Sequence, residues 1–144
     1  MSEPPRAPVG LLDTSTVVLL PRLSDESKLP EEPLISTITL AELSVGPLLA
    51  TNQTDREKRQ AVLQQTEADF DPLPFDAACA RAFGRVAASL RRSGRKPTAR
   101  SYDAMIAAVA LANDLPLFTC NPPDFAGIEE LEVVAIPHPD TPPA

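Results

Sequence analysis

The chain has 144 residues, of which 43% are hydrophobic and 23% charged, which is the length and composition of one globular domain with a single core. No apolar run approaches the roughly 20 residues needed to cross a bilayer, and the first ten residues, MSEPPRAPVG, lack the apolar stretch of a signal peptide. We therefore expect a cytoplasmic protein without a membrane segment, and its net charge of −7 excludes a uniformly basic surface.

Both ends of the chain are rich in proline. We expect flexible tails over residues 1–8 and 138–144, on either side of one domain at residues 9–137. Within that domain, short apolar runs alternate with segments of helical rhythm. This alternation is typical of an α/β fold around a mostly parallel sheet.

The first strand–helix unit lies near the start of the domain. VGLLD, residues 9–13, is a short apolar run typical of a strand, and it ends on an acid followed by three hydroxyl residues. The segment STVVLLPRL then has helical character, and we expect its cap near Ser15 and its end around Pro21.

A second unit begins at PLIST, residues 33–37, which is the next predicted strand. The segment TITLAELSV after it has a helical rhythm, and Ser36 or Thr37 is its expected N-cap. Pro47, preceded by glycine, should interrupt this helix because proline lacks the N–H that a continuing helix uses.

Three further helices and two strands are expected in the second half of the domain. The helices cover residues 54–70, residues 76–94 up to Gly94, and the stretch from Pro97 through SYDAMIAAVALAND. The strands are PLFTC at 116–120 and LEVVAI at 131–136, with the loop NPPDFAG between them.

Basic residues are concentrated between residues 81 and 110, where seven Lys or Arg and one acid give a local charge of +6 and leave −13 for the rest of the chain. A molecule polarised in this way can present a basic face to phosphate. A solvated helix edge would explain the same cluster. The candidates for contact with a nucleic-acid backbone are Arg91, Arg92, Arg95, Lys96 and Arg100.

Several common chemistries are excluded by the residues that are missing. Cys79, Cys120 and His138 cannot supply the four ligands of a zinc site, and without a secretion signal the two thiols are expected to be free and buried. His138 lies in the Pro-rich tail, which argues against Ser-His-Asp or Cys-His catalysis. No glycine motif that cradles phosphate occurs.

Two acids follow predicted strands. Asp13 ends the first strand, and Asp124 lies in the loop after PLFTC. Because ligands of open α/β sheets bind beyond the carboxyl ends of the strands, both acids are candidates for a site there. Taken alone, each is more commonly a turn residue or a helix cap.

Two more acids lie on predicted helices. Glu42 belongs to an otherwise apolar stripe that should face the sheet, where its carboxylate would need a partner. Asp103 lies on the alanine-rich side of its helix, and the same helix is expected to bury Tyr102. Solvent or a nearby arginine would explain Glu42 alone, and a pair with Arg100 would explain Asp103 alone.

A shared cation explains all four acids at once. Carboxylates that converge on one sheet edge repel each other and raise each other's pKa unless a cation shares the site. Oxygen-only ligands suit Mg²⁺ or Mn²⁺, and such an ion supports hydrolysis of a phosphodiester bond by activating water and neutralising charge on the phosphate. The set Asp13, Glu42, Asp103 and Asp124 therefore predicts a metal-dependent site.

Three segments carry a resemblance to a known family: LLDTST, TLAELSVG, and the long run RSYDAMIAAVALANDLPLFTCNPPDFAG. On these segments, which span about residues 9 to 136, the sequence resembles the PIN-domain family, specifically the VapC-type ribonuclease toxins of bacterial toxin–antitoxin pairs. The resemblance implies a three-layer α/β/α domain with a parallel sheet and a metal-dependent endoribonuclease site. There, metal-activated water would leave 5′-phosphate and 3′-hydroxyl ends on the RNA.

The resemblance also implies roles for individual residues. The catalytic and metal-binding acids would be Asp13, Glu42, Asp103 and Asp124, and the groups that hold them by hydrogen bonds would be Thr14, Ser15, Thr119 and Asn121. The family's Thr-Arg-Asn is Thr119-Cys120-Asn121 in this chain, so a basic contact expected beside the site is missing.

The partners implied by the resemblance are an RNA substrate, a second copy of the chain in a homodimer, and a VapB-type antitoxin whose C-terminal segment occupies the groove. We expect the antitoxin to clamp on the apolar region from Leu40 to Leu63. Two other functions stay open. One is a binding module that keeps the fold without catalysis. The other is a Mg²⁺-dependent phosphotransfer domain with Asp13 as nucleophile, although the haloacid dehalogenase-like pattern needs a second Asp where this chain has Ser15.

Overall fold

The computed structural model describes residues 6–96 and 100–140, and within them four strands form one sheet. The strand order is β2-β1-β3-β4, and each neighbouring pair is parallel. The strands are β1 (Val9–Leu12), β2 (Glu32–Leu34), β3 (Leu117–Thr119) and β4 (Val133–Ala135). The predicted parallel sheet is confirmed, although its strands are shorter than the apolar runs that predicted them.

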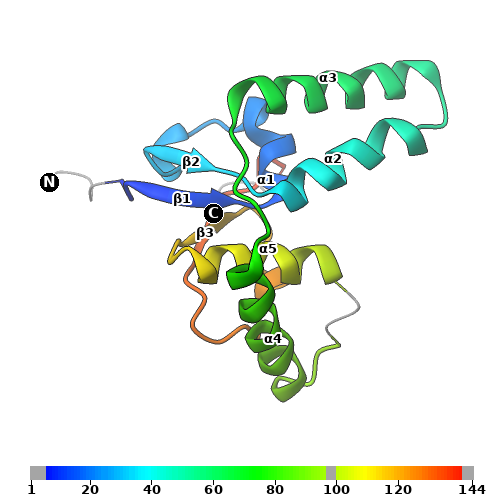
Figure 1. The fold of residues 1–144 in the computed structure, drawn as a ribbon. Helices are drawn as coiled ribbons and strands as arrows, with labels where there is room; N and C mark the ends of the chain where they lie inside the picture. Colours follow the sequence, from blue (N-terminus) through cyan, green and yellow to red (C-terminus); the bar gives the residue numbers. More distant parts are fainter. Residues whose placement is uncertain (1–5, 97–99, 141–144) are drawn as a thin grey trace, which may run out of the picture.

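Helices cover both faces of this sheet, which makes the three-layer α/β/α arrangement (Figure 1). The α2–α3 pair runs antiparallel on one side and extends beyond the sheet, and α4 and α5 pack together on the other side (Figure 1). The α-helices are α1 (Thr14–Leu19), α2 (Thr37–Leu49), α3 (Gln53–Asp69), α4 (Ala77–Arg92) and α5 (Ser101–Ala112). Short 3-10 helices lie at Leu20–Arg22, Glu26–Lys28 and Pro122–Phe125.

The alternation of side chains along the two central strands divides the core into two apolar clusters. Leu11 and Leu117 are fully buried on the side of α4 and α5, whereas Leu12 and Phe118 pack on the side of α1 and α2. Gly10 allows this close packing, because a Cβ at that position would collide with the ring of Phe118. The sheet is therefore buried on both faces, and its exposed ends are the places where a site can form.

The expected interruption of α2 at Pro47 is wrong, since the helix continues through Pro47 to Leu49. Pro47 lies close to the helix end, so its missing N–H removes only one bond of the helix. Side chains of α3 satisfy carbonyls in the same turn: Arg59 donates to the Gly46 carbonyl at 2.9 Å, and Arg56 to the Pro47 carbonyl at 3.4 Å. Packing against α3 thus completes a helix end that the local sequence disfavours.

Other expectations need smaller corrections. The first helix is capped by Asp13 and not by Ser15. Tyr102, expected to be buried, is 49% exposed. The loop NPPDFAG contains a turn of 3-10 helix. The expected helix start after Pro97 falls on residues outside the described ones. Among the described residues, α5 begins at Ser101.

The described parts of the two tails make contacts with the domain. Arg6 donates to the carbonyls of Leu29 and Pro30, each at 3.1 Å, and Arg22 forms an ion pair with Asp140. None of the described helices combines the length and apolar character that a membrane span requires.

Candidate active site

Of the four candidate acids, Asp13 accepts the most hydrogen bonds among the residues that the structure describes. It follows β1 directly, is only 2% exposed, and caps the N-terminus of α1. Its Oδ1 accepts hydrogen bonds from the backbone N–H of Thr16 at 3.2 Å and from the Thr16 hydroxyl. Its Oδ2 accepts from the Ser15 hydroxyl and from the Thr119 hydroxyl, both at 2.9 Å. Four donors therefore fix the rotamer of one carboxylate.

The end of β3 supplies the other half of this network. The hydroxyl of Thr119, which donates to Asp13, also accepts from the backbone N–H of Asn121 at 2.9 Å. The side-chain amide of Asn121 donates to the Ser15 hydroxyl at 3.0 Å. The structure thus joins the residues after β1 to those after β3, which are neighbouring strands of the sheet.

Glu42 reaches the same edge of the sheet from α2. The Thr14 hydroxyl donates to Glu42 Oε1 at 2.6 Å and lies 3.0 Å from the Thr39 hydroxyl. Burial raises the pKa of the Glu42 carboxyl, the bond from Thr14 opposes that rise, and the charge of Asp13 adds to it. The apolar stripe of α2 therefore carries Glu42 toward Asp13, with Thr14 between them.

Asp103 and Asp124 are joined by one arginine. Arg100 Nη1 lies 3.1 Å from Asp124 Oδ1 and 3.7 Å from Asp103 Oδ2. An ion pair between Arg100 and Asp103 is the alternative to a metal site that the sequence suggests. In the structure Arg100 pairs with Asp124 as well. Burial and the charges of Asp124, Asp13 and Glu42 raise the pKa of Asp103 to about 6, although Arg100 lowers it.

The electrostatic interactions place all four acids in one neighbourhood. Asp103 is influenced by each of the other three, and Glu42 by Asp13. As the side chains lie, however, no group of three or more acidic, histidine or cysteine residues in the described chain is arranged to hold a metal ion. A cation here would have to be held by one or two carboxylates with water completing its shell, which is the usual manner of Mg²⁺.

Sequence reasoning missed two residues that hold the acids. Thr16 gives two of the four hydrogen bonds to Asp13, and its hydroxyl accepts from the Cys120 backbone N–H at 3.0 Å. Thr39 supports Thr14 beside Glu42. An Asp at a helix N-cap predicts the bond from the Thr16 backbone N–H, whereas the bond from the Thr16 hydroxyl follows from the tertiary packing of the two strand ends.

Cys120 lies where the resemblance implies a basic residue. It is 7% exposed and belongs to the apolar cluster on the α1 and α2 side. Burial raises the pKa of its thiol, which is close enough to Asp13 for that charge to add to the rise. Both thiols, Cys79 and Cys120, are free and buried, as predicted.

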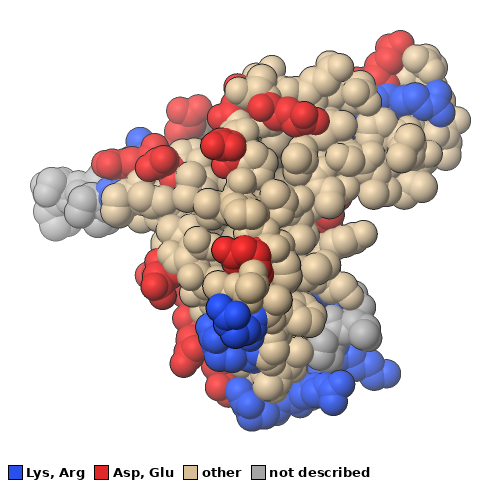
Figure 2. Space-filling view, in the orientation of Figure 1, with Lys and Arg blue, Asp and Glu red and all other residues tan. Residues whose placement is uncertain are grey.

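The basic candidates fall into two groups. Arg95, Lys96 and Arg100 line one cavity together with Asp103 and Asp124. Arg91 and Arg92 lie at the end of α4 outside that cavity, and Arg92 forms an ion pair with Glu129 at 2.9 Å. Figure 2 shows a large group of Lys and Arg side chains over this end of the molecule and a smaller one at the far tip of the α2–α3 pair, with acidic side chains spread over much of the remaining visible face.

The chain matches known proteins along most of its length. A family model for the PIN domain matches residues 11–130. Ribonuclease VapC5 of Mycobacterium tuberculosis is 38% identical over 138 residues, which cover 94% of this chain and 98% of the relative. Ribonuclease VapC of Rickettsia bellii is 28% identical over 88% of this chain and 96% of its own.

Solved structures show the same fold. The crystal structure of VapBC-5 of Mycobacterium tuberculosis, a member of the VapBC family of toxin-antitoxin systems, superposes with a TM-score of 0.77 at 35% identity, covering 90% of this chain and 99% of that one. DNA-bound VapBC from Salmonella typhimurium superposes with a TM-score of 0.66 at 26% identity, covering 88% of this chain and 96% of that one.

The raised pKa of Asp103 predicts a cost to stability that grows with pH in the metal-free protein. Asp103 ionises near 3.8 when unfolded and near 6 when folded, so stability is lost as pH rises from about 4 to about 6. Asp103→Asn removes this loss and should raise the free energy of unfolding at pH 7 by about 1–3 kcal/mol. Urea unfolding of the wild type and Asp103→Asn in EDTA at pH 4 and pH 7 measures this difference in the free energy of unfolding. An equal difference at the two pH values would contradict the prediction.

Proposed function

This chain belongs to the PIN-domain family, among the VapC-type ribonucleases, and we propose that it is a metal-dependent endoribonuclease toxin that a VapB-type antitoxin neutralises. The observation that supports the catalytic part is the convergence of Asp13, Glu42, Asp103 and Asp124 at the carboxyl end of a parallel sheet. We propose that it acts in the bacterial cytoplasm, as the resemblance implies.

The donors at this edge fit Mg²⁺ or Mn²⁺. All four are carboxylates, and burial first, then the charges of the other three acids, raise the pKa of Asp103 although Arg100 lowers it. One or two of Asp13, Glu42, Asp103 and Asp124 would hold the ion directly and the others would do so through water, and Asp103 or Asp124 would exchange its contact with Arg100 for this role. When bound, such an ion supplies activation of water and neutralisation of the charge that builds on the phosphate.

The protein's own contribution is positional. The bonds to Asp13 from Ser15, Thr16 and Thr119 keep its carboxylate in one orientation, and Thr14 does the same for Glu42. Fixed carboxylates lose little freedom when they bind a cation, so the energy of binding is not consumed in ordering them. Asp103 and Asp124, whose side chains pair with the exposed Arg100, are the acids that can adjust as RNA enters.

The geometry counts against Asp13 as a nucleophile in phosphotransfer. Both of its oxygens already accept two hydrogen bonds, and its side chain is buried. A nucleophilic carboxylate must itself reach and bond to phosphorus, whereas a small cation would require only that Asp13 exchange one hydrogen bond, such as that from the Ser15 hydroxyl. A binding module without catalysis stays as the alternative, and the cleavage experiment separates it from the proposal.

Three features support the antitoxin partner. The similar solved structures are VapBC complexes by their own descriptions. Leu48 and Leu49, inside the region expected to bind the antitoxin, are 82% and 68% exposed at the end of α2. An apolar cavity of about 300 Å³ lies between α1 and α3, with Val17, Val62 and Phe70 in its wall. The homodimer implied by the resemblance stays a prediction.

Cleavage of RNA by the purified chain tests the proposed activity. The wild type should cut labelled total RNA at discrete positions in Mg²⁺ or Mn²⁺ and not in EDTA. Thr119→Val, which removes one donor to Asp13, should lower the rate by about 10–100-fold. Asp13→Asn and Asp103→Asn should lower it further, because each removes a carboxylate that binds the cation.

The matched control is Asp114→Asn. Asp114 lies beyond the other end of α5 at a positive φ, which asparagine tolerates, so cleavage should be unchanged. Since Asp103→Asn is expected to stabilise the fold, its inactivity could not be attributed to unfolding. If the folded wild type cut no RNA in either metal, the non-catalytic binding module would replace the nuclease.

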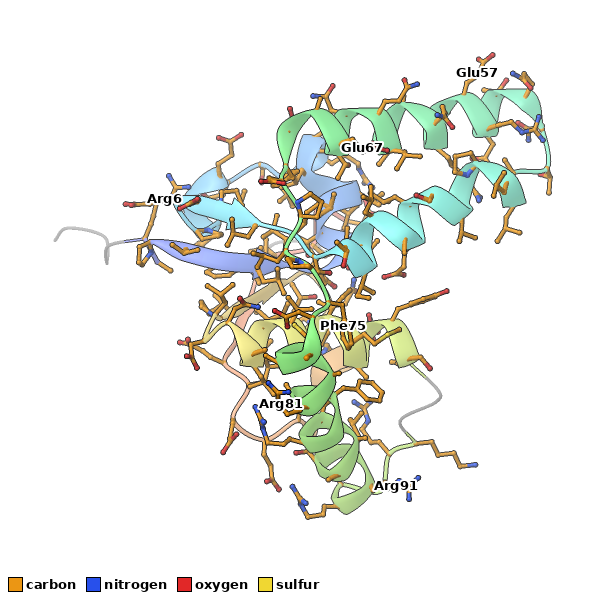
Figure 3. The ribbon with its side chains drawn as sticks, viewed as in Figure 1. Arg6, Glu57, Glu67, Phe75, Arg81 and Arg91 are labelled. Carbon is orange, nitrogen blue, oxygen red and sulfur yellow. The ribbon has the colours of Figure 1, made fainter. Side chains whose placement is uncertain are left out.

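If the antitoxin binds at the end of α2, negative charge there should weaken the complex. Leu48→Glu with Leu49→Glu should weaken binding of the cognate antitoxin by at least about tenfold, since buried apolar anchors dominate such interfaces. The melting temperature should stay the same because both side chains are exposed. Calorimetric titration checks this against Arg81→Glu, an exposed residue of α4 (Figure 3). Equal affinities for the three proteins would place the antitoxin elsewhere.

A further inference from the structure

Asp124 lies on a much shorter element than Glu42 and Asp103. Those two acids belong to α-helices of 13 and 12 residues, whereas Asp124 belongs to the 3-10 helix Pro122–Phe125, which has four residues. The hydrogen bonds of a 3-10 helix have poorer geometry than those of an α-helix. The position of Asp124 relative to the other acids therefore depends on contacts from outside this turn.

Two side chains hold the turn. Phe125 is 2% exposed and packs in the apolar cluster on the side of α4 and α5. From beyond the end of α4, Arg95 Nη1 donates to the Pro123 carbonyl at 3.1 Å and to the Ala126 carbonyl at 2.8 Å. These two carbonyls lie on either side of Asp124 in the chain, so one guanidinium spans the turn. Hydrogen bonds from a charged donor are stronger than those between neutral groups.

The backbone of Arg95 is itself fixed by the way α4 ends. Gly94 has a φ of +82°, and its N–H donates to the Arg91 carbonyl at 3.0 Å. The Arg95 N–H donates to the Leu90 carbonyl at 2.8 Å. This pair of bonds is a Schellman motif, which reverses the chain after the helix. The reversal directs the partly buried Arg95 side chain toward the turn.

The end of α4 and the loop after the turn also meet at Gly127. This residue has a φ of +85°, and a Cβ there would lie 2.5 Å from Ser93 Oγ and 3.4 Å from Arg95 Cδ. The loop therefore packs its backbone directly on the end of α4, where glycine is favoured by both conformation and space. Arg92 and Glu129 add an ion pair at 2.9 Å, but both side chains are exposed, so this pair contributes little.

We propose that Arg95 is a positioning residue for Asp124. Its guanidinium holds the backbone of the turn, so the Asp124 carboxylate stays beside the other acids and can exchange Arg100 for a cation. The basic cluster in the sequence predicted an RNA contact for Arg95, but its Nη1 already donates to two carbonyls of the protein. The proposal rests on the nuclease function above and adds a residue that touches neither the cation nor the RNA.

Hydrogen exchange in the metal-free protein tests whether Arg95 holds the turn. The amides of Asp124 and Ala126 each donate to the carbonyl three residues earlier, at 3.0 and 3.2 Å. In the full chain in EDTA, Arg95→Ala should speed exchange of these two amides by at least about tenfold. Exchange of the Leu11 amide, in the sheet, should change far less. Equal acceleration at Leu11, or none at the turn, would overturn the proposal.

The affinity for a cation separates positioning from a merely structural role. Calorimetric titration should give Arg95→Ala a Kd for Mn²⁺ about 10–100-fold above that of the wild type, as is usual when a group that holds a ligand is removed. Asp124→Asn should also raise this Kd. Adding Arg95→Ala to Asp124→Asn should raise it less than about twofold further, because Arg95 acts through Asp124. Additive effects, or wild-type affinity in Arg95→Ala, would contradict the positioning role.

Steady-state cleavage of a short oligoribonucleotide distinguishes positioning from RNA contact. Arg95→Ala should lower kcat by about 10–100-fold and leave KM and the salt dependence of kcat/KM close to those of the wild type. A raised KM with a flatter salt dependence would show a phosphate contact in its place and rule out the proposal.

Arg85→Ala is the matched control, because it removes one positive charge from an exposed position earlier in α4. It should leave kcat, the Kd for Mn²⁺ and exchange at the turn unchanged, and effects equal to those of Arg95→Ala would show that only charge matters. If the wild type cut no RNA, the exchange and Mn²⁺ measurements would still decide the role of Arg95. Failure of the nuclease function is thereby distinguished from failure of the positioning role.

Discussion

Burial of carboxylates that also repel one another is the constraint on which the rest of the site depends. Burial first, and then the charges of Asp124, Asp13 and Glu42, raise the pKa of Asp103 to about 6. The protein answers this repulsion in two ways. Hydroxyl and backbone donors surround Asp13 and reach Glu42, while a single guanidinium lies between the other two acids. Asp13 and Glu42 therefore form the rigid half of the site, and Asp103 and Asp124 form the adjustable half.

The adjustable half connects catalysis to substrate binding. Arg100 pairs with Asp103 and Asp124, and it also lines the cavity of about 230 Å³ that adjoins these two acids. A cation at the acids would compete with Arg100 and free it for phosphate, so metal and RNA would assist each other's binding. This coupling requires no movement of the sheet. It requires only that one exposed side chain exchange its partners.

Much of this arrangement could be predicted from the sequence because it follows from periodicity. Strand ends gave the positions of Asp13 and Asp124, and the helical stripe brought Glu42 to the sheet. The features that the sequence did not predict have a common physical cause, which is contact between segments distant in the chain. Arg56 and Arg59 sustain α2 past Pro47, and Arg100 bridges two acids that lie 21 residues apart in sequence. The division of the basic cluster likewise depends on the chain reversal at Gly94 and its anchoring by Arg95.

The most direct test of the central claim is paramagnetic broadening by Mn²⁺ of the backbone NMR signals of the full chain. If the four acids share one cation, substoichiometric Mn²⁺ should remove the signals of Thr14, Ala104 and Phe125 together, while those at the end of α2 near Leu49 persist. Asp13→Asn should abolish this pattern. Broadening centred on another acidic surface, such as Glu129–Glu132, or the same broadening in Asp13→Asn, would contradict the account.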